Sequence, residues 1–205
     1  MNWIVTGICT AAAVGMWYLL PASFFEKRKL TGVLLVFVTG AGSVLFQLYE
    51  YDLLQIIRYL TLMAAMLLIS GIDKKKMIIP NRLLLFLFGL RCLLLLGEYI
   101  RNWENAILEE IVLPPVLGML FGGGLFFFCY FITRKGIGAG DVKLFAVIGF
   151  YVGPGVLFPI MFLAALFSAV YGGVMVLLHK LKLSDSVPFG PFAAAGTIIT
   201  LLAGF

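Results

Sequence analysis

Two aspartates, Asp73 and Asp141, each lie where a long apolar run meets a short polar segment. Carboxylates at the edge of a membrane are costly to keep there and are often functional. Two carboxylates held close together cannot both ionise cheaply, so they share one proton. One can then take a proton from water while the other donates to a substrate carbonyl. We therefore hypothesise an aspartyl dyad that hydrolyses amide bonds without a metal or a covalent intermediate.

Asp141 follows a glycine-rich stretch and opens an apolar run. Gly138 and Gly140 have no Cβ, which lets another chain segment come close. The simpler alternative is that Asp141 is only an N-cap that accepts backbone N–H groups, and the spacing alone leaves both roles open. Because the helix dipole favours a charged carboxylate there, and Lys143 is nearby, we hypothesise that Asp141 is the ionised base and that Asp73 starts protonated.

Asp73 comes at the end of an apolar run, directly before three lysines. The simpler alternative is a charge that flanks a helix end, although aspartate is disfavoured at the negative end of the helix dipole. Pro80 and Asn81 make a favourable helix start, with Asn81 as the predicted cap. Pro188 and Gly190, ahead of the last apolar run, either shape a loop near the dyad or merely start the last helix.

The composition indicates a membrane protein. Of the 205 residues, 62% are hydrophobic and 12% are charged, against about 25% charged residues in an ordinary soluble domain. A soluble fold of this length buries only about 70% of its chain surface, too little to hide so many apolar side chains. We predict an all-α, polytopic membrane helix bundle that forms a single domain, residues 1–205. Within it, residues 1–52 form an N-terminal two-helix segment and residues 53–205 form the core that carries the motifs.

A membrane-spanning helix needs about 20 mostly apolar residues. The predicted spans are 3–20, 31–49, 53–72, 83–99, 111–132, 141–152, 156–178 and 188–205. The count is eight, or seven if the short run 141–152 does not cross the membrane. Small residues inside the spans, at 122–124 and 172–173, are predicted to let helices pack closely.

The loop charges predict the orientation. No positive residue precedes the first apolar run, and a basic cluster follows it, which places the N-terminus outside. Of the 15 Lys and Arg residues, Arg58 and Arg91 lie inside spans. With eight crossings, twelve of the other thirteen fall on the cytosolic side, together with both aspartates. Inside a span, Arg91 needs a carboxylate, a carbonyl or water as its partner.

Other site classes are excluded. The basic residues, with a net charge of +5, form short clusters between apolar runs, which is typical of cytosolic loops and not of a nucleic-acid-binding surface. The three cysteines are far apart in the sequence and form no CxxC pair, so no zinc site is predicted. We expect no metal and no cofactor.

Three segments together resemble the type IV prepilin peptidase family, the bacterial branch of the GxGD membrane aspartyl proteases. They are Asp73 with Ile79-Pro80-Asn81, then Gly138-Ala139-Gly140-Asp141-Val142-Lys143-Leu144, and finally Val187-Pro188-Phe189-Gly190-Pro191-Phe192. The resemblance extends over roughly the last two-thirds of the chain, with the segments in the family's order. It implies that Asp73 and Asp141 are the catalytic pair and that the neighbouring motif residues support them.

The resemblance also implies a substrate and a location. The substrate would be a pilin-like precursor whose short basic leader precedes an apolar helix, cut after a glycine at the cytosolic face of the inner (plasma) membrane, in contact with lipid. Long bacterial members carry a zinc-binding segment with paired CxxC motifs and also N-methylate the new N-terminus. Here that place holds only residues 21–30. A compact peptidase without metal is therefore expected, and N-methyltransferase activity is in question; the oligomeric state is not indicated.

Two alternatives stay open. One is a related GxGD protease with another membrane substrate, which would carry a Tyr-Asp pair and a Pro-Ala-Leu segment. The chain has Ile72-Asp73 and Pro188-Phe189 instead. The other is an ion-coupled transporter that uses both aspartates, which predicts charges at the membrane midplane and two related halves. The sequence shows no internal repeat.

Overall fold

The computed structural model describes residues 28–102, 108–133, 137–182 and 185–204, together with residues 7, 10–11, 14–15 and 17–18. Throughout this part of the chain the regular structure is helical, without a strand. The helices are α2 (Arg28–Leu48), α3 (Leu53–Lys76), α4 (Asn81–Arg101), α5 (Leu108–Ile111), α6 (Leu113–Ile132), α7 (Ala139–Leu177) and α8 (Gly190–Leu202). The all-α prediction is confirmed.

Five helices among the described residues are long and apolar enough to cross a membrane: α2, α3, α4, α6 with α5 before it, and α7. They contain the predicted spans 31–49, 53–72, 83–99 and 111–132, with ends shifted by a few residues. Helix α8 is apolar but shorter. The predicted span 3–20 falls mostly outside the described residues, so the total of eight crossings and the outer position of the N-terminus stay predictions.

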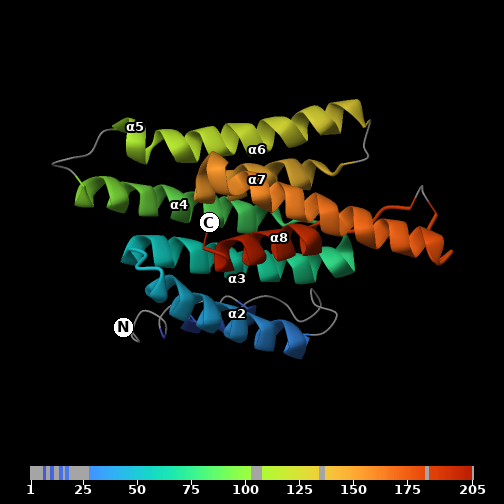
Figure 1. Ribbon diagram of the computed structural model, residues 1–205, viewed down its shortest axis with the longest axis horizontal. Helices are drawn as coiled ribbons and strands as arrows, with labels where there is room; N and C mark the ends of the chain where they lie inside the picture. Colours follow the sequence, from blue (N-terminus) through green and yellow to red (C-terminus); the bar gives the residue numbers. More distant parts are fainter. Residues whose placement is uncertain are drawn as a thin grey trace.

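Helix α7 contains a sharp break. The sequence predicts two spans, 141–152 and 156–178, and the structure has one helix whose two parts meet at Gly153. Gly153 has φ 75° and ψ 174°, a backbone conformation outside the helical region that glycine adopts readily, and Pro154 follows it. Figure 1 shows the chain turning back at this point, so that the two parts run in nearly opposite directions. The break therefore lies inside the predicted gap between the two spans.

Glycines bring α6 and the first part of α7 into backbone contact. A Cβ on either Gly118 or Gly149 would overlap the carbonyl oxygen of the other residue. A Cβ on Gly122 would lie 2.5 Å from the carbonyl oxygen of Phe145. The predicted close packing at 122–124 is thus confirmed for Gly122. It is wrong for residues 172–173, where no other described group lies within 4 Å of a Cβ.

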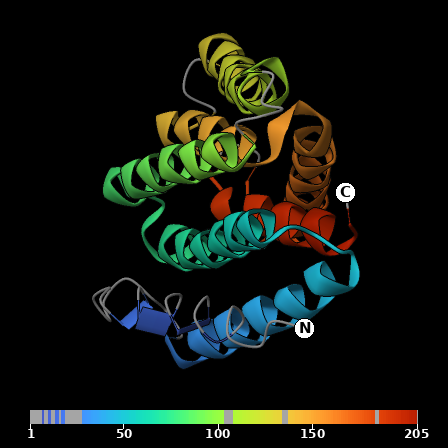
Figure 2. The ribbon, with the colours of Figure 1, turned by 90° about the vertical axis from the view of Figure 1, so that its left-hand side faces the viewer.

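Helix α3 forms the centre of the bundle. Figures 1 and 2 show it between α2 and α4, with α8 beside it. Most of its middle residues are buried, and they join the hydrophobic core formed with α4, α6, α7 and α8. Helix α8 also packs on the second part of α7, where a Cβ on Gly196 would lie 2.8 Å from the carbonyl oxygen of Ile160.

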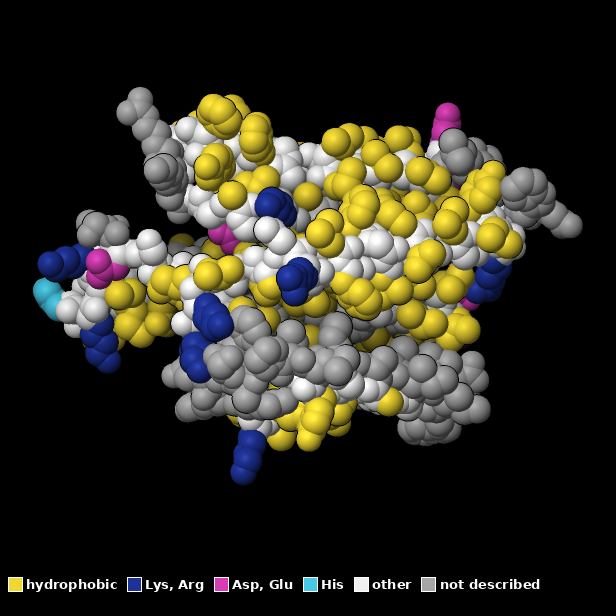
Figure 3. Space-filling model, turned by 180° about the vertical axis from the view of Figure 1, so that it is seen from behind, with side chains coloured by type: hydrophobic (Ala, Val, Ile, Leu, Met, Phe, Trp, Pro, Cys, Tyr) yellow, Lys and Arg dark blue, Asp and Glu magenta, His cyan; other side chains and the backbone are white. Residues whose placement is uncertain are grey.

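The two ends of the bundle differ in charge. One end, called here the motif end, holds the end of α3 and the starts of α4, α7 and α8. On the face shown in Figure 3, most Lys and Arg side chains gather toward one end of the molecule, while apolar side chains cover much of the remaining surface. At the opposite end Arg101 pairs with Asp52. The hydrogen bond from Arg101 holds the pKa of that carboxyl below its usual range.

Candidate active site

Asp73 lies in the last turn of α3, one turn before the helix ends. Met77 closes the helix in the left-handed conformation, with φ 52°, and donates its N–H to the carbonyl of Asp73 at 2.8 Å. The side chain of Asp73 is 5% exposed, and its Oδ2 accepts a hydrogen bond of 2.8 Å from the N–H of Gly190. The first and third motifs therefore meet where α3 ends and α8 begins.

Glycine is needed at position 190 because of this contact. A Cβ there would lie 2.8 Å from Oδ2 and 2.9 Å from Cβ of Asp73. Such distances are shorter than any ordinary van der Waals contact, so a side chain would push α8 away from the carboxylate. The absence of a Cβ lets the N–H at the start of α8 reach a buried acidic group.

Asp141 lies at the start of α7, but it is not the N-cap. Gly138 is the N-cap, α7 begins at Ala139, and Asp141 is the third helical residue. The N-cap alternative for Asp141 is therefore wrong. Its Oδ2 accepts a hydrogen bond of 3.2 Å from the N–H of Gly138, because a carboxylate at this position can reach back to the first residue of the turn. The positive end of the helix dipole favours its negative charge.

The fold brings the two aspartates together at the motif end. The carboxylates of Asp73 and Asp141 are close enough for their charges to interact. They come from the end of α3 and from the start of α7, helices that contact each other. The arrangement supplies two carboxylates from separate helices, each with one oxygen held by a glycine N–H. An aspartyl dyad needs two such carboxylates at one site.

The segment between α3 and α4 packs against the start of α7. A Cβ on Gly140 would lie 3.1 Å from Cβ of Ile79, so glycine allows this approach. Nζ of Lys143 donates to Oδ1 of Asn81 at 3.1 Å. The predicted cap role of Asn81 is wrong: Pro80 is the N-cap, and Asn81 is the first residue of α4. Its amide oxygen is used across the site instead.

Pro188 lies just before α8, and the next residue of the third motif is Phe189. The Phe189 ring lies 5.9 Å from the Phe126 ring and 5.8 Å from the Phe145 ring, centroid to centroid. Phe126 and Phe145 stack in parallel at 4.0 Å. These rings fix the start of α8 against α6 and α7. Phe189 stands out through its motif, whereas nothing in the sequence distinguishes Phe126 and Phe145 from the many other aromatic residues in apolar runs.

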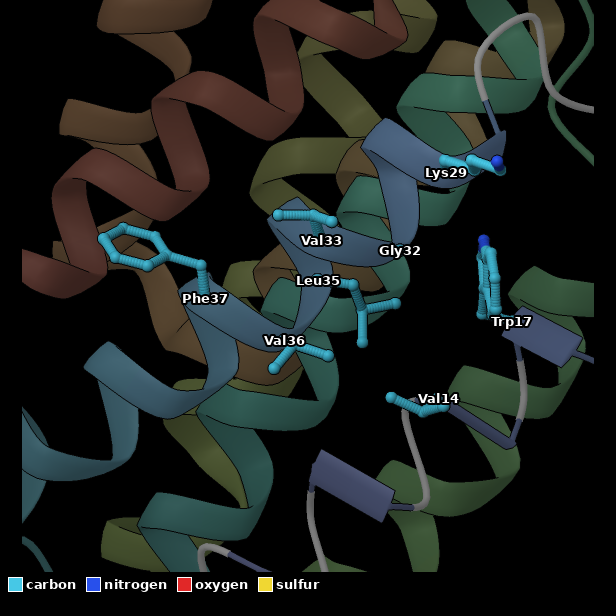
Figure 4. Close-up of a pocket in the computed structure, with 8 residues that line it drawn as sticks. All are labelled: Val14, Trp17, Lys29, Gly32, Val33, Leu35, Val36 and Phe37. Carbon is cyan, nitrogen blue, oxygen red and sulfur yellow. The ribbon is translucent and has the colours of Figure 1, made fainter.

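A separate apolar cavity of about 650 Å³ lies along α2, away from the aspartates. Figure 4 shows its lining, which includes Trp17, Leu35 and Phe37, with Lys29 at one edge. No motif residue lines it. Within the described ranges, no group of three or more His, Cys, Asp or Glu side chains could hold a metal ion.

Comparison with known proteins gives one family. The type IV leader peptidase family matches residues 60–173, which include both aspartates and the glycine motif. The prepilin leader peptidase/N-methyltransferase of Bacillus subtilis (strain 168) is 34% identical over 139 residues, 68% of this chain and 52% of the relative. The protein of the same name from Dichelobacter nodosus is 30% identical over 174 residues, 84% of this chain and 57% of the relative.

The chain spans about half the length of the curated relatives it matches. No solved structure matches it. The family match nevertheless covers more than half of the chain and contains Asp73, Asp141 and the first two of the three motif segments. This chain therefore belongs to the type IV leader peptidase family.

Proposed function

We propose that the chain is a membrane aspartyl endopeptidase that removes the basic leader from type IV pilin-like precursors. The observation that carries this proposal is the meeting of Asp73 and Asp141 at the motif end. Each carboxylate has one oxygen held by a glycine N–H. The relatives named above are prepilin leader peptidases, which favours this activity over an ion-coupled transporter or another GxGD protease.

In the proposed mechanism the two aspartates have different roles in proton transfer. Asp141, at the positive end of α7, takes a proton from the attacking water. Asp73, buried at the negative end of α3, holds the shared proton and donates it to the carbonyl oxygen of the scissile bond. The tetrahedral intermediate then collapses, and the leaving amine receives a proton from the dyad. Gly138, Gly140 and Gly190 keep the two carboxylates in place, and Lys143 with Asn81 links the start of α7 to α4.

The substrate follows from charge and polarity. The basic leader is attracted to the negative dyad and to the anionic lipid surface, while the apolar helix of the precursor lies against the apolar outer surface of the bundle. We place the protein in the inner (plasma) membrane with eight crossings and the motif end toward the cytosol. The lysines of the motif end support this orientation.

Cleavage of a pilin-like precursor by purified protein in detergent tests the proposal. Wild type should release the leader, whereas Asp73→Asn and Asp141→Asn should each reduce the rate by at least about 10³-fold, since neither half of the dyad works alone. Asp185→Asn is the matched control, because Asp185 is exposed and accepts a local hydrogen bond from the N–H of Lys182. Cleavage that survives both dyad changes would rule out the mechanism.

The same assay addresses methylation. With S-adenosylmethionine added, the mass of the trimmed product shows whether its new N-terminus carries a methyl group. We expect the peptidase reaction to proceed without this additive and the product to stay unmethylated. A methylated product would show that the shorter chain retains both activities that the names of its relatives give.

A further inference from the structure

The break in α7 leaves one backbone carbonyl without its usual donor. In an α-helix the carbonyl of residue i accepts the N–H of residue i+4. For Phe150 that residue is Pro154, which has no N–H. Phe150 is 4% exposed, so water does not replace the missing bond freely. A buried carbonyl in this position needs another donor.

Arg91 of α4 supplies that donor. Its Nε donates to the carbonyl oxygen of Phe150 at 3.1 Å, and its side chain is fully buried. The guanidinium carbon also lies 5.8 Å from the centre of the Phe150 ring, which stacks on Phe88 of α4. Arg91 therefore ties α4 to the first part of α7 at the point where that part ends. This is the carbonyl partner that a guanidinium inside a span requires.

The need to neutralise Glu98 does not by itself explain the presence of Arg91. Glu98 accepts hydrogen bonds from Arg91 Nη1 at 3.0 Å and from Arg58 Nη1 at 3.2 Å. Either arginine alone would neutralise Glu98, so one of the two is not needed for that purpose. What distinguishes Arg91 from Arg58 is the bond to Phe150.

We propose that Arg91 is a positioning residue for the aspartyl dyad. Residues 139–152 form a helical segment about 20 Å long that carries Asp141 near one end and Phe150 near the other. Lys143 and Asn81 bind the first end to α4, and Arg91 binds the second end to the same helix. A helix held at both ends cannot pivot, so the carboxylate of Asp141 keeps its place beside Asp73. The inference rests on the proposed function for its catalytic consequence.

Two substitutions at position 91 separate the hydrogen bond from the charge. In Arg91→Gln the amide nitrogen stands at the same place along the side chain as Nε, so a donor to Phe150 remains. In Arg91→Met a methyl group stands there instead. Both variants lose the charge and leave Glu98 paired with Arg58. Arg58→Met is the matched control, because it removes one charge but keeps the bond to Phe150.

Hydrogen exchange of backbone amides within 144–152, measured in detergent, gives the first readout. In Arg91→Met this segment should exchange about tenfold or more faster, the effect of losing one hydrogen bond to a charged group. Arg91→Gln and Arg58→Met should stay within about threefold of wild type. Equal loss in Arg91→Gln and Arg91→Met, or protection unchanged in Arg91→Met, would overturn the proposal. If Arg91→Met does not fold, Arg91→Gln serves as the test. Wild-type protection of residues 144–152 in Arg91→Gln supports the role of the hydrogen bond to Phe150, and lost protection refutes it.

Kinetics give the second readout. Arg91→Met should lower kcat by about tenfold or more at unchanged KM, because a misplaced carboxylate slows the chemistry while the substrate surface is untouched. Arg91→Gln should restore kcat, which a merely structural loss would not predict. A rise in KM with kcat unchanged would contradict the positioning role. Hydrogen exchange does not depend on cleavage, so the two proposals can fail separately. If the wild-type chain cleaves no precursor, the proposed function is contradicted, and hydrogen exchange alone tests the role of Arg91.

Discussion

The carboxylate of Asp73 is bonded to a residue 117 positions later in the chain, and a single missing Cβ makes that bond available. The sequence singles out Asp73 and Gly190 by residue type, and the resemblance implies that both belong to one site. Neither predicts that the N–H at the start of α8 is the partner. That contact depends on how α8 packs against α3, which no local pattern encodes.

At the level of single residues, Gly190→Ala should nearly abolish cleavage of the precursor. The added Cβ would lie 2.8 Å from Oδ2 of Asp73, so α8 must move and the carboxylate must shift. A displacement of about 1 Å at a reacting group reduces the rate by about 10²-fold. Initial rates of precursor cleavage measure the effect. Gly124→Ala is the control, because no other described group lies within 4 Å of a Cβ there; wild-type rates in Gly190→Ala would show that the contact is dispensable.

The starts of α4 and α7 show where residue-level prediction was wrong. Asn81 and Asp141 both have the residue types that favour helix caps, and the predicted cap at Asn81 and the alternative cap role of Asp141 both lie too late in the chain. Pro80 and Gly138 hold the cap positions instead, so the Asn81 amide binds Lys143 and the Asp141 carboxylate reaches back to the N–H of Gly138. At Asn81 a tertiary contact uses the polar group that local preference would have assigned to the backbone.

Among the helices, the contact between α6 and α7 is the closest in the bundle. The sequence located the ends of both helices, because long apolar runs and Gly-Pro-Gly at 153–155 are strong local signals. It could not pair Gly118 with Gly149, since many glycines lie inside apolar runs and only some of them meet another backbone. Glycines 122 and 172 look equivalent in the sequence, and only the first is in contact with another helix.

Gly149→Ala should therefore destabilise the bundle. The new Cβ would overlap the carbonyl oxygen of Gly118, and the helices can only separate. Inserting a group into such a contact reduces the free energy of unfolding by about 1–3 kcal/mol or more. Thermal unfolding in detergent measures it. Gly155→Ala, two residues after the break, meets no described atom within 4 Å and should leave the melting temperature nearly unchanged; equal effects of the two changes would argue against close backbone packing.

At the scale of the molecule, the distribution of charge predicts the orientation. Lys182, in the loop between α7 and α8, is exposed, and so is Asn102, at the outer end of α4 in our proposal. With the native cysteines replaced, Asn102→Cys should react with a membrane-impermeant maleimide in intact cells. Lys182→Cys should react only after permeabilisation. The reverse pattern would invert the orientation and move the dyad to the outer face.

That residues 1–205 form a single domain is also a statement about the whole molecule, and it stays a prediction. Hydropathy found the membrane-spanning runs because a bilayer demands long apolar segments. It gave no information on which helices are neighbours, since every lipid-facing or core-facing side chain is apolar. The central position of α3 follows from side-chain packing that becomes visible only once the helices are assembled.

The unequal lengths of two neighbouring helices set how far Asp141 lies from the end of the bundle. Helix α6, with 20 residues, is about 30 Å long, and residues 139–152 of α7 span about 20 Å. They share one level at the outer end, where Gly153 lies beside Pro114. From that level α6 continues for 18 residues to Ile132 and α7 for 14 residues to Ala139, so the other end of α6 extends beyond the start of α7 by about 6 Å. Under the proposed function, a precursor would have to bring its scissile bond past the end of α6 to reach the two aspartates.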